Sequence, residues 1–472
     1  MNRRALGWVA VLALVPAAGV LRAETPVGAW NAPHMANPVL PGYFADPSVL
    51  QVGGTITLYA TLDPWGDRTL GCWQSVDFKH WSYHPLNWPT KEACSSQDSN
   101  PGANVWAPSV VRVPGGRFYM YVSVGSEVWV GSAESPLGPW TDANGGKPLV
   151  PRGFDRTYHM IDAEAFVDDD GRVYLYWGSG WNWVNGRCYA ARLGADFVSF
   201  DGPVRIVTPP GGHYFEAPFM ARRFGRYFLM YSGGKTISDT YCVHYAVGPT
   251  PFGPFTEGAN TPILATDRTR DIISPGHHAI LRVAGRDYIA YHRHRLPYVE
   301  GTAFRQVCID SITFHPDGTI DNVSPTHTGP ELVRGRTRPG NLADPGTGAT
   351  ASASSVQDAL HGPACVLDDN YATRWAPSTD DRTPWLELDL GGMKAVLRNE
   401  IRPEYAWKSC RFALESSADG RDWTVLADHR GDGGLSGSPL LIDSAVTARY
   451  LRLVFGPTGT EDSPSVFEWQ VF

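Results

Sequence analysis

What the sequence lacks excludes several protein classes. After residue 23 no stretch of about 18 or more residues is continuously apolar, so we expect no membrane-spanning helix downstream. None of the seven cysteines forms a Cys-x-x-Cys pair, which argues against a zinc site. Lysine and arginine total 40 against 48 acidic residues, the formal charge is −8, and basic clusters are absent. We therefore expect no nucleic-acid partner.

The first 23 residues have the pattern of a signal peptide. Arg3 and Arg4 precede an apolar run over residues 5–21, and Ala23 offers a small residue for cleavage. A retained anchor is the alternative, but the run is short for one. Cleavage removes three arginines and no acid, which changes the formal charge from −8 to −11. We expect an exported protein, periplasmic or extracellular, with no membrane attachment once residues 1–23 are removed.

The seven cysteines are compatible with disulfides, because exported proteins meet an oxidising environment. Cys72 with Cys94, and Cys365 with Cys410, are candidate pairs because each pair is close in sequence. The odd total leaves at least one thiol free. The sequence specifies neither the pairing nor the oligomeric state.

Aromatic residues are plentiful, with 17 tryptophans and 20 tyrosines, and they mark a repeat. Five similar apolar and aromatic segments are centred on Tyr59, Tyr121, Tyr176, Tyr231 and Tyr291. The intervals are 55–62 residues, each segment follows a glycine-containing turn, and no helical periodicity appears. Such a repeat is typical of propeller blades. The surplus of rings also suits sugar recognition, although β-rich cores favour aromatics in any case.

The repeat predicts an all-β chain with more than one domain. We expect a five-bladed β-propeller over residues 30–333. Residues 334–349 contain few large apolar side chains and are interpreted as a linker. Residues 350–472 resume short alternating strands between turns, which favours a β-sandwich.

The innermost strand of each predicted blade begins about 12–15 residues before its aromatic marker. At nearly the same offset these five segments present Asp46, Trp106, Asp162, Glu216 and His277. Inner strands line the channel of a propeller, so we expect these side chains to converge at one mouth of it. Buried carboxylates are costly unless they are paired, hydrated or functional. Capping of strands is the structural alternative.

Three converging carboxylates suit the hydrolysis of a glycosidic bond. One carboxyl protonates the leaving oxygen, and a second activates water or attacks carbon. A third raises the pKa of the acid by like-charge repulsion. The alternative from another class is a non-catalytic carbohydrate-binding propeller, and the presence of all three carboxylates argues against it.

Five ordered motifs resemble glycoside hydrolase family 43 over the whole propeller: ADPSV, WAPSV, IDAEAFVDDDGRVYLYWG, FEAPF and GHHAI. The resemblance implies an inverting enzyme with Asp46 as the general base. It makes Asp162 the residue that tunes the pKa of the acid and orients it, and Glu216 the general acid. Inversion leaves room for water between base and acid, so their carboxyls should lie about 6.5–9.5 Å apart.

The same resemblance gives roles to three further residues. Trp106 matches an aromatic residue that packs beside the sugar, and Arg305 matches an arginine that contacts sugar or acid. His277 matches a histidine near the channel axis that faces a hydrated calcium, through water. No organic cofactor is implied. Other aromatic residues are candidates for lining the substrate pocket: Phe44, Trp65, Trp181, Trp183 and Tyr214.

Some positions depart from the family's pattern or allow two interpretations. Asp162 is followed by Ala163, where the family commonly has proline. Of the two consecutive histidines we expect His277, rather than His278, to face the channel. The run Asp168–Asp170 is interpreted as part of a hairpin turn, because it lacks the spacing of a calcium loop.

Residues 350–472 resemble the coagulation-factor 5/8 type C, or discoidin-like, domains, which include the family 32 carbohydrate-binding modules. The matching stretches are LDDNYATRW, WLELDLG, SADGRDW, ARYLRL and the late Glu468. Such domains often hold a structural calcium, for which Asp368, Thr373 and Glu468 are candidate ligands.

The sequence thus predicts an exo-acting, inverting hydrolase with a polysaccharide or oligosaccharide substrate. We expect it to release α-L-arabinofuranosyl or β-D-xylosyl units from plant cell-wall polysaccharide. An endo-arabinanase and a galactan-acting enzyme are the alternatives within the class, because loops from five blades shape the pocket.

Overall fold

The computed structural model describes residues 30–96, 103–431, 433–456 and 464–472. The expected signal peptide lies outside these residues. Within them the helices are four short 3-10 turns: η1 (Arg152–Phe154), η2 (Arg268–Arg270), η3 (Pro345–Thr347) and η4 (Pro363–Leu367). All other regular structure is β, which confirms the predicted fold class. None of the described helices is long and apolar enough to cross a membrane.

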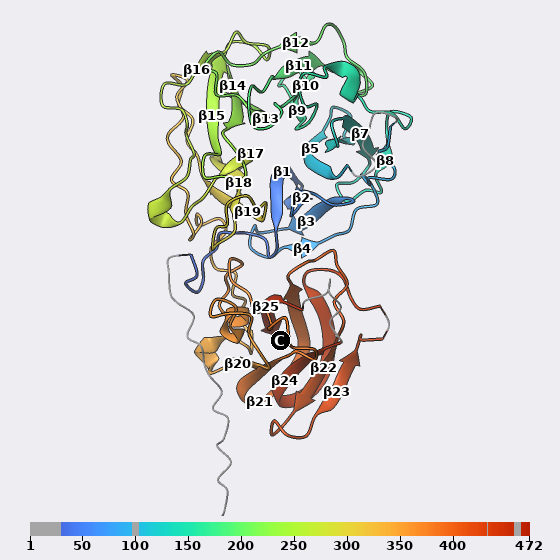
Figure 1. Ribbon diagram of the computed structural model, residues 1–472, viewed down its shortest axis with the longest axis vertical. Coiled ribbons are helices and arrows are strands. Elements are labelled where there is room, and N and C mark those ends of the chain that lie inside the picture. Colours follow the sequence, from blue (N-terminus) through green and yellow to red (C-terminus); the bar gives the residue numbers. More distant parts are fainter. Residues whose placement is uncertain (1–29, 97–102, 432, 457–463) are drawn as a thin grey trace, which may run out of the picture.

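Five small antiparallel sheets form a ring, which is the upper domain in Figure 1. In each sheet the strands follow one another in chain order, and the first strands of neighbouring sheets contact each other around the centre. We call these sheets blades 1 to 5. Blade 1 contains β1 (Phe44–Val52), β2 (Thr55–Leu62), β3 (Leu70–Ser75) and β4 (Ser82–Tyr83), and blade 2 contains β5 (Val105–Arg112), β6 (Phe118–Val124), β7 (Val128–Ala133) and β8 (Thr141–Asp142). Blade 3 contains β9 (Glu164–Val167), β10 (Val173–Trp177), β11 (Tyr189–Arg192) and β12 (Arg205–Ile206), and blade 4 contains β13 (Glu216–Arg223), β14 (Arg226–Gly233), β15 (Cys242–Gly248) and β16 (Thr256–Glu257). Blade 5 contains β17 (Gly276–Val283), β18 (Arg286–His294) and β19 (Arg305–Ser311).

The ring is closed by the segment that precedes β1. Blade 5 has only three strands, and β19 is its outer one. The backbone amide of Val39 donates to the carbonyl of Val307, and the side chain of Asn37 bonds both the amide and the carbonyl of Ile309. The start of the described chain therefore occupies the edge of the last blade.

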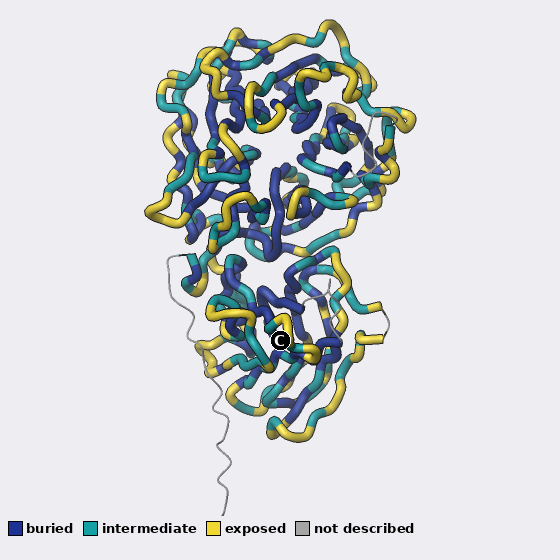
Figure 2. The backbone as a smooth tube through the Cα atoms, viewed as in Figure 1, coloured by how far each residue is buried: buried dark blue, intermediate teal, exposed yellow. Residues whose placement is uncertain are grey.

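The second domain is a β-sandwich of six strands: β20 (Thr350–Ala353), β21 (Trp385–Pro403), β22 (Phe412–Ser417), β23 (Thr424–Asp428), β24 (Leu440–Phe455) and β25 (Val466–Val471). The long strands β21 and β24 pair over most of their length, with register shifts that bend them. Trp375 and Trp469 are fully buried among the aliphatic residues of its core. In both domains the buried backbone follows the strands and the exposed backbone follows the connecting turns (Figure 2).

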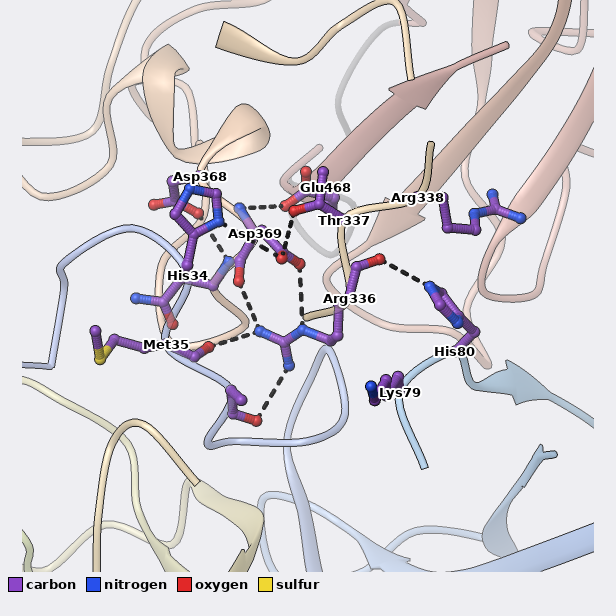
Figure 3. Close-up of polar contacts among 12 residues, drawn as sticks. His34, Met35, Lys79, His80, Arg336, Thr337, Arg338, Asp368, Asp369 and Glu468 are labelled. Carbon is purple, nitrogen blue, oxygen red and sulfur yellow. Dashed lines mark hydrogen bonds and ion pairs between the residues drawn. The ribbon is translucent and has the colours of Figure 1, made fainter. Parts of the chain in front are cut away.

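The segment expected to be a linker is packed between the two domains. The Arg336 side chain is buried, and its guanidinium donates to the carbonyls of Met35, Ala36 and Pro38. It also donates to the carboxylate and the carbonyl of Asp369 (Figure 3). Residues 334–349 thus hold the propeller and the sandwich together instead of forming a free tether.

Direct contacts between the domains extend this junction. Arg402 donates to the carbonyl of Trp81 at 2.9 Å, and the Trp407 indole donates to Asp67 at 3.1 Å. The Tyr43 hydroxyl donates to Glu404 at 3.0 Å. These contacts come from several elements on each side, so they fix the orientation of the sandwich against blade 1.

Neither candidate disulfide is present. All seven cysteines are among the described residues, and none is joined to another. Cys72 on β3 and Cys94 both lie in the core of blades 1 and 2, where burial raises the pKa of the Cys94 thiol to about 12. Closeness in sequence was the sole basis for the pairs, and it says nothing about the geometry that a disulfide requires.

We predict that Arg336→Ala weakens the junction. The substitution leaves four carbonyls and the Asp369 carboxylate without the buried Arg336 donor, which should lower the free energy of unfolding by about 3 kcal/mol. Urea denaturation of the full chain should then show two separate transitions, one for each domain. Arg334→Ala, at an exposed arginine two residues earlier, serves as the control and should unfold like the parent. Equal stability of both variants would refute the assigned role of Arg336.

Candidate active site

A non-glycine residue in the left-handed region lies near the start of the first strand of every blade. The φ angles are 52° at Asp46, 45° at Ala107, 58° at Asp162, 54° at Ala217 and 40° at His277. In blades 1, 2, 4 and 5 the register with the second strand shifts at this point. Each such residue costs about 1–3 kcal/mol, so the repeated strain marks a functional feature. It ends the regular alternation of side chains and directs the first residues of the inner strands toward the mouth of the channel.

Side chains of the preceding blade accept hydrogen bonds from the backbone amides of four of these left-handed residues. The amide of Ala107 donates to Thr61 Oγ1, that of Asp162 to Ser123 Oγ, and that of His277 to Ser232 Oγ, at 2.8–2.9 Å. The amide of Asp46 donates to His292 Nδ1 at 3.2 Å, which closes the circle between blades 5 and 1. In four of the five blades, the preceding blade therefore helps to position the start of the inner strand.

The side chains at these strand starts surround one cavity of about 220 Å³. Asp46, Asp162, Glu216 and His277 line it together with Arg305 and Trp106. The sequence-predicted residues from all five blades are thus brought together. The volume is below that of pockets for drug-sized ligands, which suits one sugar unit.

Asp46 is buried and surrounded by donors. Its Oδ1 lies 3.1 Å from both His277 Nδ1 and Arg305 Nη1, and its Oδ2 accepts from Thr61 Oγ1 at 2.7 Å. Burial acts to raise the pKa of this carboxyl. The charges of Arg305 and His277 outweigh it and hold the pKa of Asp46 well below its usual range. Asp46 is therefore ionised.

Arg305 is itself fixed by a second buried carboxylate. Its Nε and backbone amide donate to Asp63 Oδ2 at 2.9 and 2.8 Å, and its Nη2 donates to Asp63 Oδ1 at 2.8 Å. This bidentate ion pair with Asp63 leaves Arg305 Nη1 free to donate to Asp46 Oδ1. Asp63 thus positions the cation that keeps Asp46 charged.

Glu216 and Asp162 lie in a different electrostatic environment. Glu216 accepts from the Tyr241 hydroxyl at 2.8 Å and from Ser179 Oγ at 3.0 Å. Burial raises the pKa of Glu216, and the charge of Asp46 adds to the rise, although His277 and Tyr241 oppose it. Burial likewise raises the pKa of Asp162 to about 8, with further contributions from Glu216 and Asp46. These two carboxyls favour the protonated form.

His277 lies between the acidic groups, 3.1 Å from Asp46 and 3.7 Å from Asp162. Burial acts to lower its pKa, but Asp46, Asp162 and Glu216 together raise it to about 9. The ring is therefore charged at neutral pH. His278 points elsewhere, with its ring 5.5 Å from that of Phe219, so the choice of His277 for the channel agrees with the geometry.

Aromatic side chains form the rim of the cavity. Trp65 and Trp181 are 40% and 37% exposed, and Trp183 also lines the opening. The Trp106 indole donates to the carbonyl of Trp65 at 2.7 Å, and His159 stacks on Trp181 with ring centroids 4.2 Å apart. Exposed ring faces at a polar cavity suit the apolar face of a sugar.

Phe44 does not line the cavity, so that prediction was wrong. Its side chain is fully buried and packs edge-on against Trp73 of blade 1 and Trp407 of the sandwich. In a regular strand Phe44 and Asp46 would share a face, but the left-handed Asp46 breaks the alternation between them. Tyr214 is also buried, where its hydroxyl donates to the carbonyl of Gly178, and it is not among the lining residues.

Several residues that support the site were not singled out from the sequence. They are Thr61, Asp63, Ser123, Ser179, Tyr241 and His159. Most lie at or just after the end of a blade's second strand. The position two residues after the aromatic marker of a repeat could have indicated Thr61, which follows Tyr59, and Ser123, which follows Tyr121. Tyr241 comes from a loop and carries no such signal.

Glu164, which follows Ala163, is an additional half-buried carboxyl. It accepts from Ser109 Oγ at 2.7 Å, and burial raises its pKa to about 8. It does not line the cavity. The run Asp168–Asp170 forms the turn between β9 and β10, in which the Gly171 amide donates to the Asp168 carbonyl.

The residues suggested for calcium in the sandwich lie close together. Thr373 Oγ1 donates to Asp368 at 2.7 Å, and the Asp369 amide donates to Glu468 at 3.2 Å. Burial raises the pKa of both Asp368 and Glu468 well above the usual range, so this set of oxygens suits a cation such as Ca²⁺. Within the described ranges, however, no group of three or more His, Cys, Asp or Glu residues has the arrangement of a metal site. Calcium here and beside His277 stays a prediction.

Comparison with known proteins places this geometry in a family. Residues 35–320 match the glycosyl hydrolases family 43, and residues 349–468 match the F5/8 type C domain. The chain belongs to glycosyl hydrolase family 43. It is therefore a glycoside hydrolase, whose substrate is a polysaccharide or oligosaccharide, joined to a discoidin-like domain.

The individual relatives differ in their named activities. The chain is 34% identical to a beta-D-galactofuranosidase of Aspergillus niger over 64% of this chain and 87% of that protein. It is 26% identical to an arabinoxylan arabinofuranohydrolase of Bacillus subtilis over 62% of this chain and 65% of that protein. A solved structure described as a glycoside hydrolase superposes over 94% of this chain and all of its own, with a TM-score of 0.78 and 26% identity. The two-domain arrangement therefore recurs in a known structure.

Proposed function

We propose that this glycoside hydrolase is exo-acting and inverting, and that it releases α-L-arabinofuranosyl or β-D-xylosyl units from plant cell-wall polysaccharide or its oligosaccharides. Asp46 is the general base, Glu216 the general acid, and Asp162 the residue that tunes and orients the acid. The observation that carries the proposal is the opposite direction of the pKa shifts of Asp46 and Glu216 within one cavity.

These opposite shifts match the two tasks of an inverting enzyme. A base must be ionised to take a proton from water, and the Arg305 and His277 charges keep Asp46 in that form. An acid must hold its proton until the leaving oxygen takes it, and burial of Glu216 favours the protonated form. Asp162 and Glu216 repel each other when both are ionised, so the presence of Asp162 opposes loss of the Glu216 proton.

The shape of the site favours removal of one sugar at a time. The acidic residues lie in a cavity of about 220 Å³. A single unit fills this volume, and the rest of the substrate extends past the Trp65 and Trp181 rim. This geometry supports exo action over cleavage within a chain.

A second candidate sugar is β-D-galactofuranose. The relative with 34% identity is named a beta-D-galactofuranosidase, and it aligns over most of its own length. Arabinofuranose and galactofuranose are both five-membered rings, so one cavity of this size suits either. The aromatic rim contacts the remainder of the substrate in both cases.

The location and the second domain fit a polymeric substrate. We infer export through the expected signal peptide, because plant polysaccharides do not enter cells. The sandwich belongs to a domain class that includes carbohydrate-binding modules, and it is fixed to blade 1 by Arg336 and its neighbours. A sugar-binding role for it agrees with an exported enzyme.

A panel of 4-nitrophenyl glycosides tests the proposal. We expect the α-L-arabinofuranoside or β-D-xyloside to be cleaved fastest, with the β-D-galactofuranoside as the second candidate. Proton NMR of the first-formed product should show the inverted anomer. Net retention would contradict the mechanism, and cleavage of none of the three would contradict the substrate class.

Two variants assign the acid and the base in the same experiment. Asp46→Asn should lower kcat about 10²–10⁴-fold on every substrate, because water is no longer activated. Glu216→Ala should lower it as much on an oligosaccharide but less on the nitrophenyl glycoside, whose leaving group needs little protonation. If Glu216→Ala matched the parent on both substrates, Glu216 could not be the acid.

The pH dependence tests the role of Arg305. The base must be ionised, so activity falls as the pH drops through the pKa of Asp46, which Arg305 holds low. Arg305→Gln removes that charge, and the acidic limb of the kcat/KM profile should move upward by about 1–3 pH units. Arg305→Lys keeps the charge and should move it much less. An unmoved acidic limb in Arg305→Gln would show that Asp46 is not the titrating base.

A further inference from the structure

A second cavity, of about 210 Å³, lies at the junction of the two domains. We call it the junction cavity. The propeller contributes Tyr43, Arg295 and Gln306 to its lining, among others, and the sandwich contributes His361 and Arg374. Its volume is close to that of the catalytic cavity, so it accommodates a ligand of the same size.

The walls of the junction cavity are fixed before any ligand arrives. Gln306 donates to the carbonyl of Tyr371 at 3.0 Å, and Tyr43 donates to Glu404 at 3.0 Å. Each of these bonds joins the propeller to the sandwich, as does the Arg336 network nearby (Figure 3). A preformed site loses little conformational entropy on binding.

The polar groups of the cavity comprise donors and an acceptor. The Arg374 side chain is only 12% exposed, and its Nε lies 3.0 Å from Glu404 as an ion pair; among the described residues this buried Nε has no hydrogen-bond partner. His361 Nδ1 lies 2.7 Å from Asp358. Burial and the charge of Arg374 lower the pKa of His361, so the ring is neutral and this contact assigns the proton to Nδ1. The unprotonated Nε2 of His361 can therefore accept a hydrogen bond. A sugar hydroxyl both donates and accepts hydrogen bonds, so it suits a cavity that offers the Arg374 donor and the His361 acceptor.

The charges around the cavity balance. Arg295 and Arg374 are offset by Asp358 and Glu404, and His361 is neutral. The cavity therefore has no excess of positive charge to favour a uronic acid or a phosphate. Trp30, Tyr43 and Phe467 supply apolar surface. This composition suits a neutral sugar.

The junction cavity and the catalytic cavity are neighbours at one end of blade 5. Arg305 and Gln306 are consecutive residues of β19, and successive side chains of a strand point to opposite sides. Arg305 lines the catalytic cavity, and Gln306 lines the junction cavity. One polysaccharide chain is long enough to contact both.

We propose that the junction cavity is a second glycan-binding site, which takes one neutral sugar unit of the polysaccharide whose terminal unit enters the catalytic cavity. The site is built by both domains, so neither domain alone contains it. It raises the affinity for polymers over small glycosides, because the second contact is made within one complex. The proposal rests on the proposed action on polysaccharides but not on which sugar is cleaved.

Isothermal titration calorimetry tests the proposal with the full chain carrying Glu216→Gln, so that the polymers remain intact. The probes are soluble arabinoxylan, linear arabinan and a galactofuranose-containing galactomannan. His361→Ala removes the acceptor, and Ala372→Phe, at another lining residue, obstructs the cavity without removing a polar group. In the Glu216→Gln chain, each of these two substitutions should raise the Kd for the bound polymer about tenfold.

His315→Ala is the matched control. His315 also pairs with a carboxylate, Asp321, at 2.8 Å, but it is outside the junction cavity. The Kd of the His315→Ala variant for the bound polymer should equal that of the Glu216→Gln parent. Thermal denaturation should show that all variants are folded. An unchanged Kd in both cavity variants, or no binding of any polymer by the parent, would overturn the proposal. Because this background does not turn over substrate, the result is independent of the hydrolysis assays, and failure of one proposal is distinguishable from failure of the other.

Discussion

The left-handed backbone at the start of each inner strand is the constraint on which the site depends. Regular strands would alternate their side chains between neighbouring blades, and the acidic groups would be separated. The left-handed residues Asp46, Asp162 and His277 instead face a common centre, with Glu216 and Trp106 one position before the equivalent residues. Hydrogen bonds from the preceding blade offset the strain, so the closed ring is part of the catalytic apparatus.

Electrostatics then separates the roles of chemically similar groups. Asp46 and Glu216 are carboxyls of the same cavity, but of these two only Asp46 lies against two cations. Asp63 and Thr61 act through this arrangement, since Asp63 fixes Arg305, and Thr61 joins the Asp46 carboxylate to the Ala107 amide of the next blade. The docked sandwich contributes as well, because Trp407 packs on Phe44, two residues before the base.

Periodicity and motif order were sufficient to predict the blades and the five residues that meet in the cavity. Alternation of side chains failed for Phe44, because the left-handed Asp46 interrupts it. The composition of residues 334–349 suggested a linker but gave no sign of the buried Arg336, whose hydrogen bonds to both domains place this segment in the junction. Tyr241, His159 and the junction cavity depend on loops and on contacts between domains, which have no period in the sequence.

The most direct test is a crystal structure of the Glu216→Gln protein with an oligosaccharide that the parent enzyme cleaves. The account predicts one terminal sugar enclosed by Asp46, Asp162 and residue 216, with a water molecule between Asp46 and the anomeric carbon. A sugar bound outside this cavity, or one whose anomeric carbon is remote from Asp46, would contradict it.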